Sequence, residues 1–248
     1  MGEMIEFAAN GGTCPGYLVQ TESEVAPGVV VLQEWWGIEG SKSDIKEIAE
    51  RFAAAGYTAL APDLYHGAVA EEPDEAGKLM MSLRIDRAAQ DLRGAIEHLR
   101  GLTGKPVGIV GFCMGGALAL YAACENPEGV AACVDFYGGY PGIEPDLAGL
   151  RAPLLGLFAE KDGNVTPQVV KELDEQLTTL GKAHELTIYP GAQHAFFNHL
   201  RPEVHDPQAS ADAWRQINAW FEQYLGFTEQ QLNSDEQLKS AYDSEDKG

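Results

Sequence analysis

VGIVGFCMGGALAL, residues 107–120, joins a strand pattern to a helix pattern through a tight turn. Residues 107–112 form a short, continuous apolar run, which predicts a strand covered on both faces. Residues 115–126 predict a helix. The glycines on both sides of Cys113 permit strained backbone angles and a close approach of the helix to the strand. Cys113 is therefore expected where a strand ends and a helix begins.

The same alternation of strand and helix patterns recurs along the chain. Five further short apolar runs predict strands at residues 28–34, 58–63, 129–138, 153–162 and 184–191. Helical patterns occupy residues 43–56, 84–101, 166–181 and 212–226. This order predicts an α/β protein with a mostly parallel central sheet and helices on both faces. Residues 16–21 are expected to add an antiparallel edge strand, and residues 66–82 to flank the entrance of a pocket.

No internal repeat or linker divides the 248 residues. We expect a single domain over residues 1–226. Residues 227–248 are polar and acidic, which predicts a frayed C-terminal tail or a peripheral helix.

The chain carries 38 acidic and 17 basic residues, a formal net charge of −21. Nucleic acid and anionic membranes are bound chiefly through Lys and Arg, so neither is an expected partner. The sequence contains no run of about 18 apolar residues, so no membrane span is expected. The N-terminus lacks the features of a signal peptide. We expect a cytoplasmic protein that is a monomer or a small homo-oligomer.

The four cysteines form no C-x-x-C pair and have no histidine at zinc-ligand spacing. Free thiols in a reducing compartment are expected, with no metal. No G-x-G-x-x-G follows a strand, so no organic cofactor is expected either. A redox pair of Cys113 with Cys124 is excluded, because eleven helical residues separate them by about 16 Å.

GFCMG, residues 111–115, matches the G-x-S-x-G nucleophile elbow of α/β-hydrolases, with sulfur in place of oxygen. The positive end of the following helix favours a thiolate at this position. A buried structural cysteine is the alternative interpretation of Cys113. Such a cysteine has no need of glycines on both sides, so the context favours a nucleophile.

A nucleophile requires a base, and the base requires an orienting acid; in α/β-hydrolases the two follow in the order acid, histidine. Asp162 ends a predicted strand just before a Gly-Asn turn, and Glu160 is its rival, earlier in the strand. His194 lies in the loop after the last predicted strand, where the base is expected. The other five histidines do not have this position relative to a strand.

Together these stretches resemble the dienelactone hydrolase (carboxymethylenebutenolidase) family of α/β-hydrolases. The similar segments are QEWWG (33–37), GYTALAPDLY (56–65), VGIVGFCMGGALAL (107–120), FYGG (136–139), AEKDGNVTP (159–167) and YPGAQHAFFN (189–198). The resemblance implies an α/β-hydrolase fold and hydrolysis of a small-molecule ester or lactone by a triad of Cys113, Asp162 and His194. It also implies that Glu34 contacts the thiol and helps to produce the thiolate.

The resemblance extends to the surroundings of the triad. The backbone N–H groups of Trp35 and Met114 are expected to form the oxyanion hole. Trp36 and Phe196 are expected to line the substrate pocket.

The sequence departs from the family pattern at the arginines that hold a substrate carboxylate. Gly67 and Asn198 occupy the two positions where arginines are expected, and Arg84 or Arg201 could substitute for them. Sulfur leaves a tetrahedral intermediate more readily than an alkoxide does. This favours enol lactones, aryl esters or thioesters as substrates. The alternative function is a non-catalytic small-molecule binder or sensor on the same fold.

Overall fold

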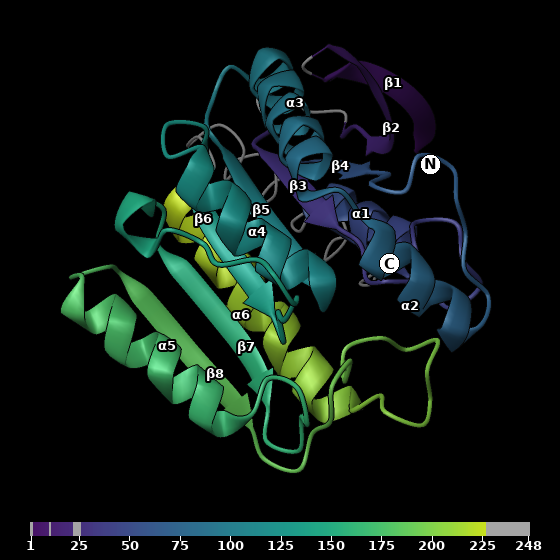
Figure 1. The fold of residues 1–248 in the computed structure, drawn as a ribbon. Helices are drawn as coiled ribbons and strands as arrows, with labels where there is room; N and C mark the ends of the chain where they lie inside the picture. Colours follow the sequence, from purple (N-terminus) through teal and green to yellow (C-terminus); the bar gives the residue numbers. More distant parts are fainter. Residues whose placement is uncertain (1, 10, 22–25, 227–248) are drawn as a thin grey trace, which may run out of the picture.

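A single eight-stranded sheet organises the described part of the chain, residues 2–9, 11–21 and 26–226 of a computed structural model (Figure 1). The spatial order of the strands is β1-β2-β4-β3-β5-β6-β7-β8. The strands are β1 (Glu3–Ala9), β2 (Gly12–Val19), β3 (Gly28–Leu32), β4 (Thr58–Pro62), β5 (Val107–Phe112), β6 (Val130–Phe136), β7 (Leu154–Ala159) and β8 (His184–Tyr189). The pairs β1·β2 and β2·β4 are antiparallel and all others parallel. The prediction of a mostly parallel sheet is confirmed.

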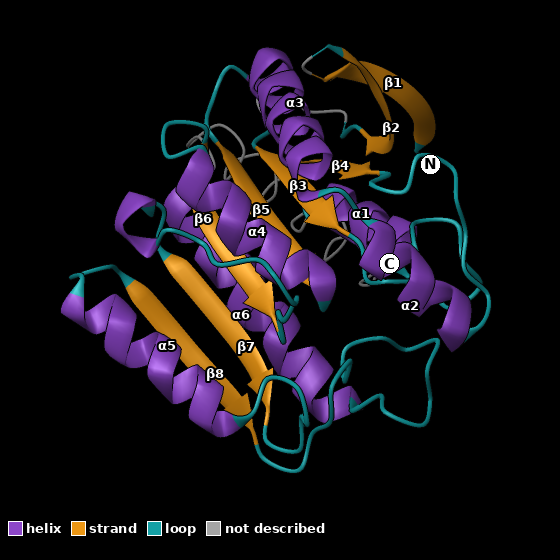
Figure 2. Ribbon diagram, viewed as in Figure 1, coloured by secondary structure: helices purple, strands orange, loops and turns teal. Residues whose placement is uncertain are grey.

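Helices cover both faces of this sheet (Figure 2). They are α1 (Ile45–Ala54), α2 (Pro73–Ser82), α3 (Ile85–Thr103), α4 (Met114–Glu125), α5 (Pro167–Thr179) and α6 (Pro207–Leu225), with a 3-10 turn at Leu147–Gly149. Val29 and Val31 of β3 face the core beneath α1 and α6, whereas Val30 and Leu32 face the core beneath α3 and α4. A strand buried on both faces explains why its sequence is continuously apolar. None of the helices in the described residues combines the length and the apolar character needed to cross a bilayer.

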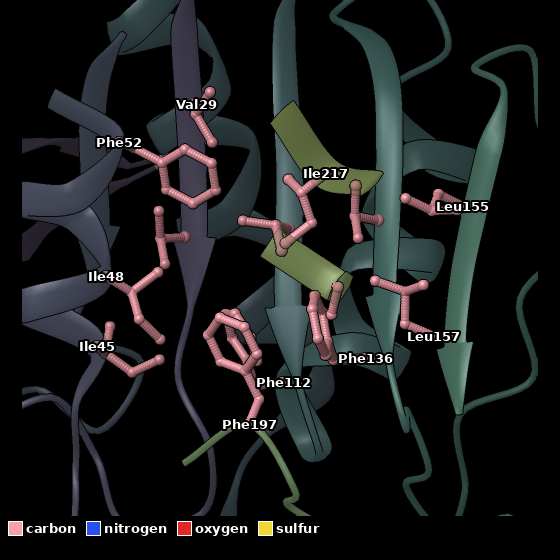
Figure 3. Close-up of a cluster of buried hydrophobic side chains, with 14 of the residues drawn as sticks. Val29, Ile45, Ile48, Phe52, Phe112, Phe136, Leu155, Leu157, Phe197 and Ile217 are labelled. Atoms are coloured by element: carbon pink, nitrogen blue, oxygen red, sulfur yellow. The ribbon is translucent and has the colours of Figure 1, made fainter. Parts of the chain in front are cut away.

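Three phenylalanines at the centre of the α1/α6 face lie directly before, or within, loops of the candidate site (Figure 3). Phe112 ends β5 and Phe136 ends β6, and their ring centroids are 4.6 Å apart. Phe197, from the loop after β8, stacks on Phe112 at 5.4 Å. Each buried aromatic ring stabilises the fold by roughly 2–3 kcal/mol. The same packing fixes the three loops relative to one another.

The N-terminal edge of the sheet differs from the prediction. The edge strand is β1, which the sequence analysis missed, and β2 lies inside it over residues 12–19 rather than 16–21. Towards its end β1 alternates exposed and buried residues, and both of its charged residues, Glu3 and Glu6, are exposed. Charged residues are common on edge strands because they discourage further pairing.

Two helices also differ from expectation. α2 lies within residues 66–82, which were expected only to flank a pocket; it begins with Pro73 after a capping box formed by Glu72 and Glu75. These are ordinary helix-start signals, but one turn of apolar residues is too little to show a helical period. α6 begins at Pro207, five residues before the predicted start, because Asp206 caps it. The predicted tail, residues 227–248, lies outside the described residues.

Candidate active site

Cys113 occupies a strained turn between β5 and α4. Its backbone has φ 56° and ψ −120°, a conformation that costs a non-glycine residue about 1–3 kcal/mol. The turn is held by the Cys113 N–H, which donates to the carbonyl of Phe136 at 3.0 Å. A Cβ on Gly111 would overlap the Gly115 carbonyl, and a Cβ on Gly115 would lie 2.5 Å from the carbonyl oxygen of Gln33. The two glycines therefore permit the close approach of strand and helix, while the positive φ falls on the cysteine itself.

Asp162 follows β7 and fixes the orientation of His194. One carboxylate oxygen of Asp162 accepts the backbone N–H groups of Asn164 (2.7 Å) and Val165 (3.0 Å). The other accepts from Nδ1 of His194 at 2.6 Å. Because Nδ1 of His194 pairs with Asp162, Nε2 is the ring nitrogen left for Cys113, whose side chain acts on the pKa of the imidazole. The structure thus brings Asp162 and His194 into contact and places Cys113 on the wall of the cavity that His194 also lines.

The electrostatics of this chain favour a charged imidazole. Burial alone would lower the pKa of His194, but its hydrogen bonds to Asp162 and Cys113 outweigh this and raise the pKa to about 10. Burial would likewise raise the pKa of Asp162, yet His194 and two backbone N–H groups hold it below its usual value. A charged imidazole beside a thiol favours formation of the thiolate, which is the nucleophilic form of a cysteine. Glu160, the rival acid, is exposed and accepts instead from the N–H of Gly191.

Glu34 lies two residues beyond the end of β3 and is only 3% exposed. One of its carboxylate oxygens accepts from Nδ2 of Asn198 at 2.8 Å, and the other from the hydroxyl of Tyr137 at 3.4 Å. Burial raises the pKa of Glu34, although Asn198, His194 and Arg201 oppose the rise. A carboxyl group whose pKa is raised in this way is suited to accept and return a proton.

Cys113, His194 and Glu34 line a common cavity of about 490 Å³. Its walls are largely apolar and come from several loops and from α2; they include Trp35, Met80, Tyr140, Pro141 and Ala195. Arg201 is the cationic side chain among the described lining residues. Its Nε donates to Glu203 at 3.0 Å, so part of its charge is already compensated. The cavity has the size and the mixed polarity of a small-molecule site.

The two residues predicted for the oxyanion hole lie on either side of Cys113. Trp35 lines the cavity. Met114 is the first residue of α4, so its N–H lies outside the hydrogen-bond ladder of that helix. Its side chain is buried, and its sulfur accepts from the hydroxyl of Tyr65 at 3.6 Å. The role of these two N–H groups as donors to the oxyanion stays a prediction.

Three of the four residues expected in the pocket lie elsewhere. Trp36 is 2% exposed and packs against Ala70 and Ala76 behind the cavity wall, so Trp35 lines the cavity in its place. Phe196 is fully buried against Tyr137 and Tyr189. Alternate residues of a loop face opposite ways, which explains why an aromatic neighbour of the right residue can point into the core.

The arginines divide in the same manner. Arg84 is exposed, pairs with Asp86 and lines a separate surface depression beside Arg87. Arg201 lines the cavity and is the better placed of the two to meet a substrate. The sequence analysis did not identify Met80, Tyr140 or the contacts of Tyr137 and Asn198 with Glu34. Only the FYGG segment offered a signal for Tyr137.

A second grouping of Cys, His and Asp lies at the end of β4, where Cys14, His66 and Asp91 place ligand-type atoms within 4.8 Å of one another. Cys14 is fully buried and burial raises its thiol pKa, so it is no nucleophile. Arg87 donates to Nδ1 of His66 at 3.0 Å, which leaves the proton on Nε2 to be donated to Asp91 at 2.7 Å. Both ring nitrogens of His66 are thus used in hydrogen bonds and are not free to bind a metal, so the group fits a hydrogen-bond network.

Known proteins are similar to this chain over most of its length. Residues 14–225 match the Dienelactone hydrolase family. The chain is 38% identical over 231 residues to Protein usf of Aquifex pyrophilus, covering 91% of this chain and 100% of that protein. It is 37% identical, with the same coverage, to an Aquifex aeolicus protein named "Putative carboxymethylenebutenolidase". The crystal structure of a "Putative Dienelactone Hydrolase" from Klebsiella pneumoniae matches with a TM-score of 0.80 and 26% identity, covering 90% of this chain and 99% of that chain. The chain therefore belongs to the dienelactone hydrolase family, and it is a carboxylic ester or lactone hydrolase with the α/β-hydrolase fold.

Proposed function

We propose that the chain cleaves an activated ester or enol lactone through Cys113, with His194 as base and Asp162 as its orienting acid. The observation that carries the proposal is the position of His194: its Nδ1 bonds Asp162 at 2.6 Å, and its ring lines the same cavity as Cys113, whose side chain acts on the pKa of the imidazole. A non-catalytic binder has no use for this chain of contacts.

The reaction proceeds in two halves. The Cys113 thiolate attacks the carbonyl carbon, and the N–H groups of Met114 and Trp35 stabilise the oxyanion. The C–O bond then breaks, the leaving oxygen takes the proton of the His194 imidazolium, and a thioester acyl-enzyme remains. In the second half His194 removes a proton from water, whose oxygen attacks the thioester and releases the acid and the thiolate.

Glu34 serves the first half of this cycle. When the resting thiol is protonated, the Glu34 carboxylate accepts that proton as the thiolate forms, and returns it when the thiol is regenerated. The position of Glu34 in the same cavity as Cys113 and its raised pKa support this role.

The chemistry of sulfur and the charges of the cavity together favour neutral, activated substrates. A thiolate is expelled before a poor leaving group such as an alkoxide, so an enolate, phenolate or thiolate leaving group is required. Inside the cavity the Glu34 carboxyl opposes a substrate carboxylate, and Arg201 already pairs with Glu203. The apolar walls at Trp35 and Tyr140 suit a planar aryl or lactone group.

The test compares kcat/KM at neutral pH on a neutral aryl ester and on a dienelactone, with Cys113→Ala as the inactive control. We expect the aryl ester to be preferred and the control to lose at least about a thousandfold in kcat/KM. Preference for the dienelactone, lost in Arg201→Gln, would show that Arg201 holds a substrate carboxylate after all. If neither substrate is turned over faster than by Cys113→Ala, the hydrolytic mechanism is refuted and a binding function takes its place.

A further inference from the structure

Asn198 makes a complete and directed set of hydrogen bonds next to Glu34. The side chain is 1% exposed. Its Nδ2 donates to the Glu34 carboxylate at 2.8 Å and to the Lys42 carbonyl at 2.9 Å, while its Oδ1 accepts the N–H of Leu200 at 3.0 Å. Only this orientation of the amide pairs every donor with an acceptor. Both amide hydrogens are therefore committed, and one of them is aimed at Glu34.

The backbone of Asn198 is fixed by the loop that also carries His194. The N–H of Asn198 donates to the carbonyl of Ala195 at 3.0 Å, and its own carbonyl accepts the N–H of Arg201 at 3.2 Å. Phe197, the preceding residue, is anchored in the core against Phe112. A side chain on such a rigid support can hold a partner in one rotamer.

The groups that face Glu34 divide between those that favour its charge and those that oppose it. Burial and the Asp44 carboxyl at the start of α1 oppose the ionised form. Asn198, His194, Arg201 and the Tyr137 hydroxyl favour it. Of these four, Asn198 makes the shorter of the two hydrogen bonds to the carboxylate. Hydrogen bonds to a charged acceptor are among the stronger ones in proteins.

We propose that Asn198 is a positioning residue, which holds Glu34 as a carboxylate in a fixed orientation so that it can take the proton of the Cys113 thiol. The inference rests on the proposed function. In the step concerned, the S–H bond of Cys113 breaks and an O–H bond forms on Glu34, and the proton returns when the thiol is restored. Asn198 neither gains nor loses a proton. Its contribution is to keep the acceptor ionised inside a buried cavity.

Two substitutions of nearly equal size test the role. Asn198→Leu removes the donor, and Asn198→Asp replaces it with a second carboxyl group at the same place. Either change disfavours the ionised form of Glu34. In a plot of kcat/KM against pH, the fall in activity on the acid side (the acid limb) therefore moves to higher pH. A shift of at least about one pH unit is expected, which is a tenfold loss below the limb. Thermal unfolding of each variant shows whether the fold is retained.

The control is the same pair of substitutions in a Glu34→Gln background, where no shift of the limb is expected. A uniform loss at every pH with the limb unmoved, or an equal shift in the Glu34→Gln background, would overturn the proposal. The protonation of Glu34 is also followed without catalysis, as the infrared carbonyl band that disappears in Glu34→Gln. That band should persist to higher pH in Asn198→Leu, and its failure to do so counts against the proposal even if the ester mechanism itself fails.

Discussion

Asp162→Asn is the sharpest test of the triad, because the structure fixes how the new side chain must lie. The backbone N–H groups of Asn164 and Val165 donate to one oxygen of Asp162. Asparagine can keep these bonds only by placing its amide oxygen there, so its NH₂ group then faces Nδ1 of His194. The amide NH₂ group, a donor, now faces Nδ1 of His194, which is itself the donor in the wild type. The imidazole must move its proton to Nε2, and that nitrogen can then no longer accept the proton of the attacking water.

We expect this change to lower kcat by about 10³- to 10⁴-fold, or about 4–5.5 kcal/mol of transition-state stabilisation. The assay is kcat and KM on an aryl ester at neutral pH, with KM expected to change little because the cavity wall is preserved. Glu160→Gln is the matched control, a carboxylate-to-amide change two residues away, at an exposed position. It should stay within about twofold of the wild type. The assignment of Asp162 as the orienting acid would be refuted if kcat fell less than tenfold in Asp162→Asn, or if it fell more in Glu160→Gln than in Asp162→Asn.

Three further outcomes follow from packing, burial and exposure. Gly115→Ala should lower the free energy of unfolding, measured in urea, by about 3 kcal/mol or more, because the new Cβ would lie 2.5 Å from a backbone oxygen. Gly77→Ala is the control: this glycine lies in a helix with open space around it, so the substitution should raise the free energy of unfolding by up to about 1 kcal/mol. Burial raises the pKa of Asp135 to about 7. Between about pH 4 and 7 the Asp135 carboxyl is therefore protonated in the folded chain but ionised in the unfolded chain, so the folded state loses stability as the pH rises through this range. Over the same range Tm should fall less steeply with pH in Asp135→Asn than in the wild type. Iodoacetamide should modify Cys113 before the three buried cysteines, as peptide mass spectrometry would show, and equal labelling of Cys14 would contradict the burial found here.

The elbow and the positions of the acid and the base could be predicted from the sequence because they depend on local chain order. A parallel sheet brings the carboxyl ends of its strands to one edge, so residues placed just after three apolar runs must meet there. Cys113, Asp162 and His194 satisfy this condition: the structure brings Asp162 and His194 into contact and places Cys113 on the cavity that His194 lines. The boundaries of the strands were overestimated by up to three residues, since polar residues such as Asp162 already belong to the loops.

The remainder of the site depends on which way a side chain points within a loop, and composition carries no such information. Trp35 and Trp36 are identical in type, yet one lines the cavity and the other is buried behind it. Asn198 was considered only as the absence of an arginine, because its contact with Glu34 joins residues 164 positions apart. Met80 reaches the cavity through α2, a helix whose apolar period is too short to recognise.

Backbone strain marks the same edge of the sheet independently of any motif. Four non-glycine residues have a positive φ in the described part of the chain: Cys113 and Tyr137 directly follow β5 and β6, and His66 and Ala195 lie in the loops after β4 and β8. Each position costs about 1–3 kcal/mol and persists only where the surrounding packing enforces it. The enforcement is visible here, since Phe112 and Phe136 immediately precede two of these residues and pack against each other in the core. In this conformation Cys113 lies on the cavity wall and the Tyr137 hydroxyl donates to Glu34. Glycine would relieve the strain at less cost to folding, so the retention of side chains at these positions argues that the edge is shaped for its chemistry rather than for stability.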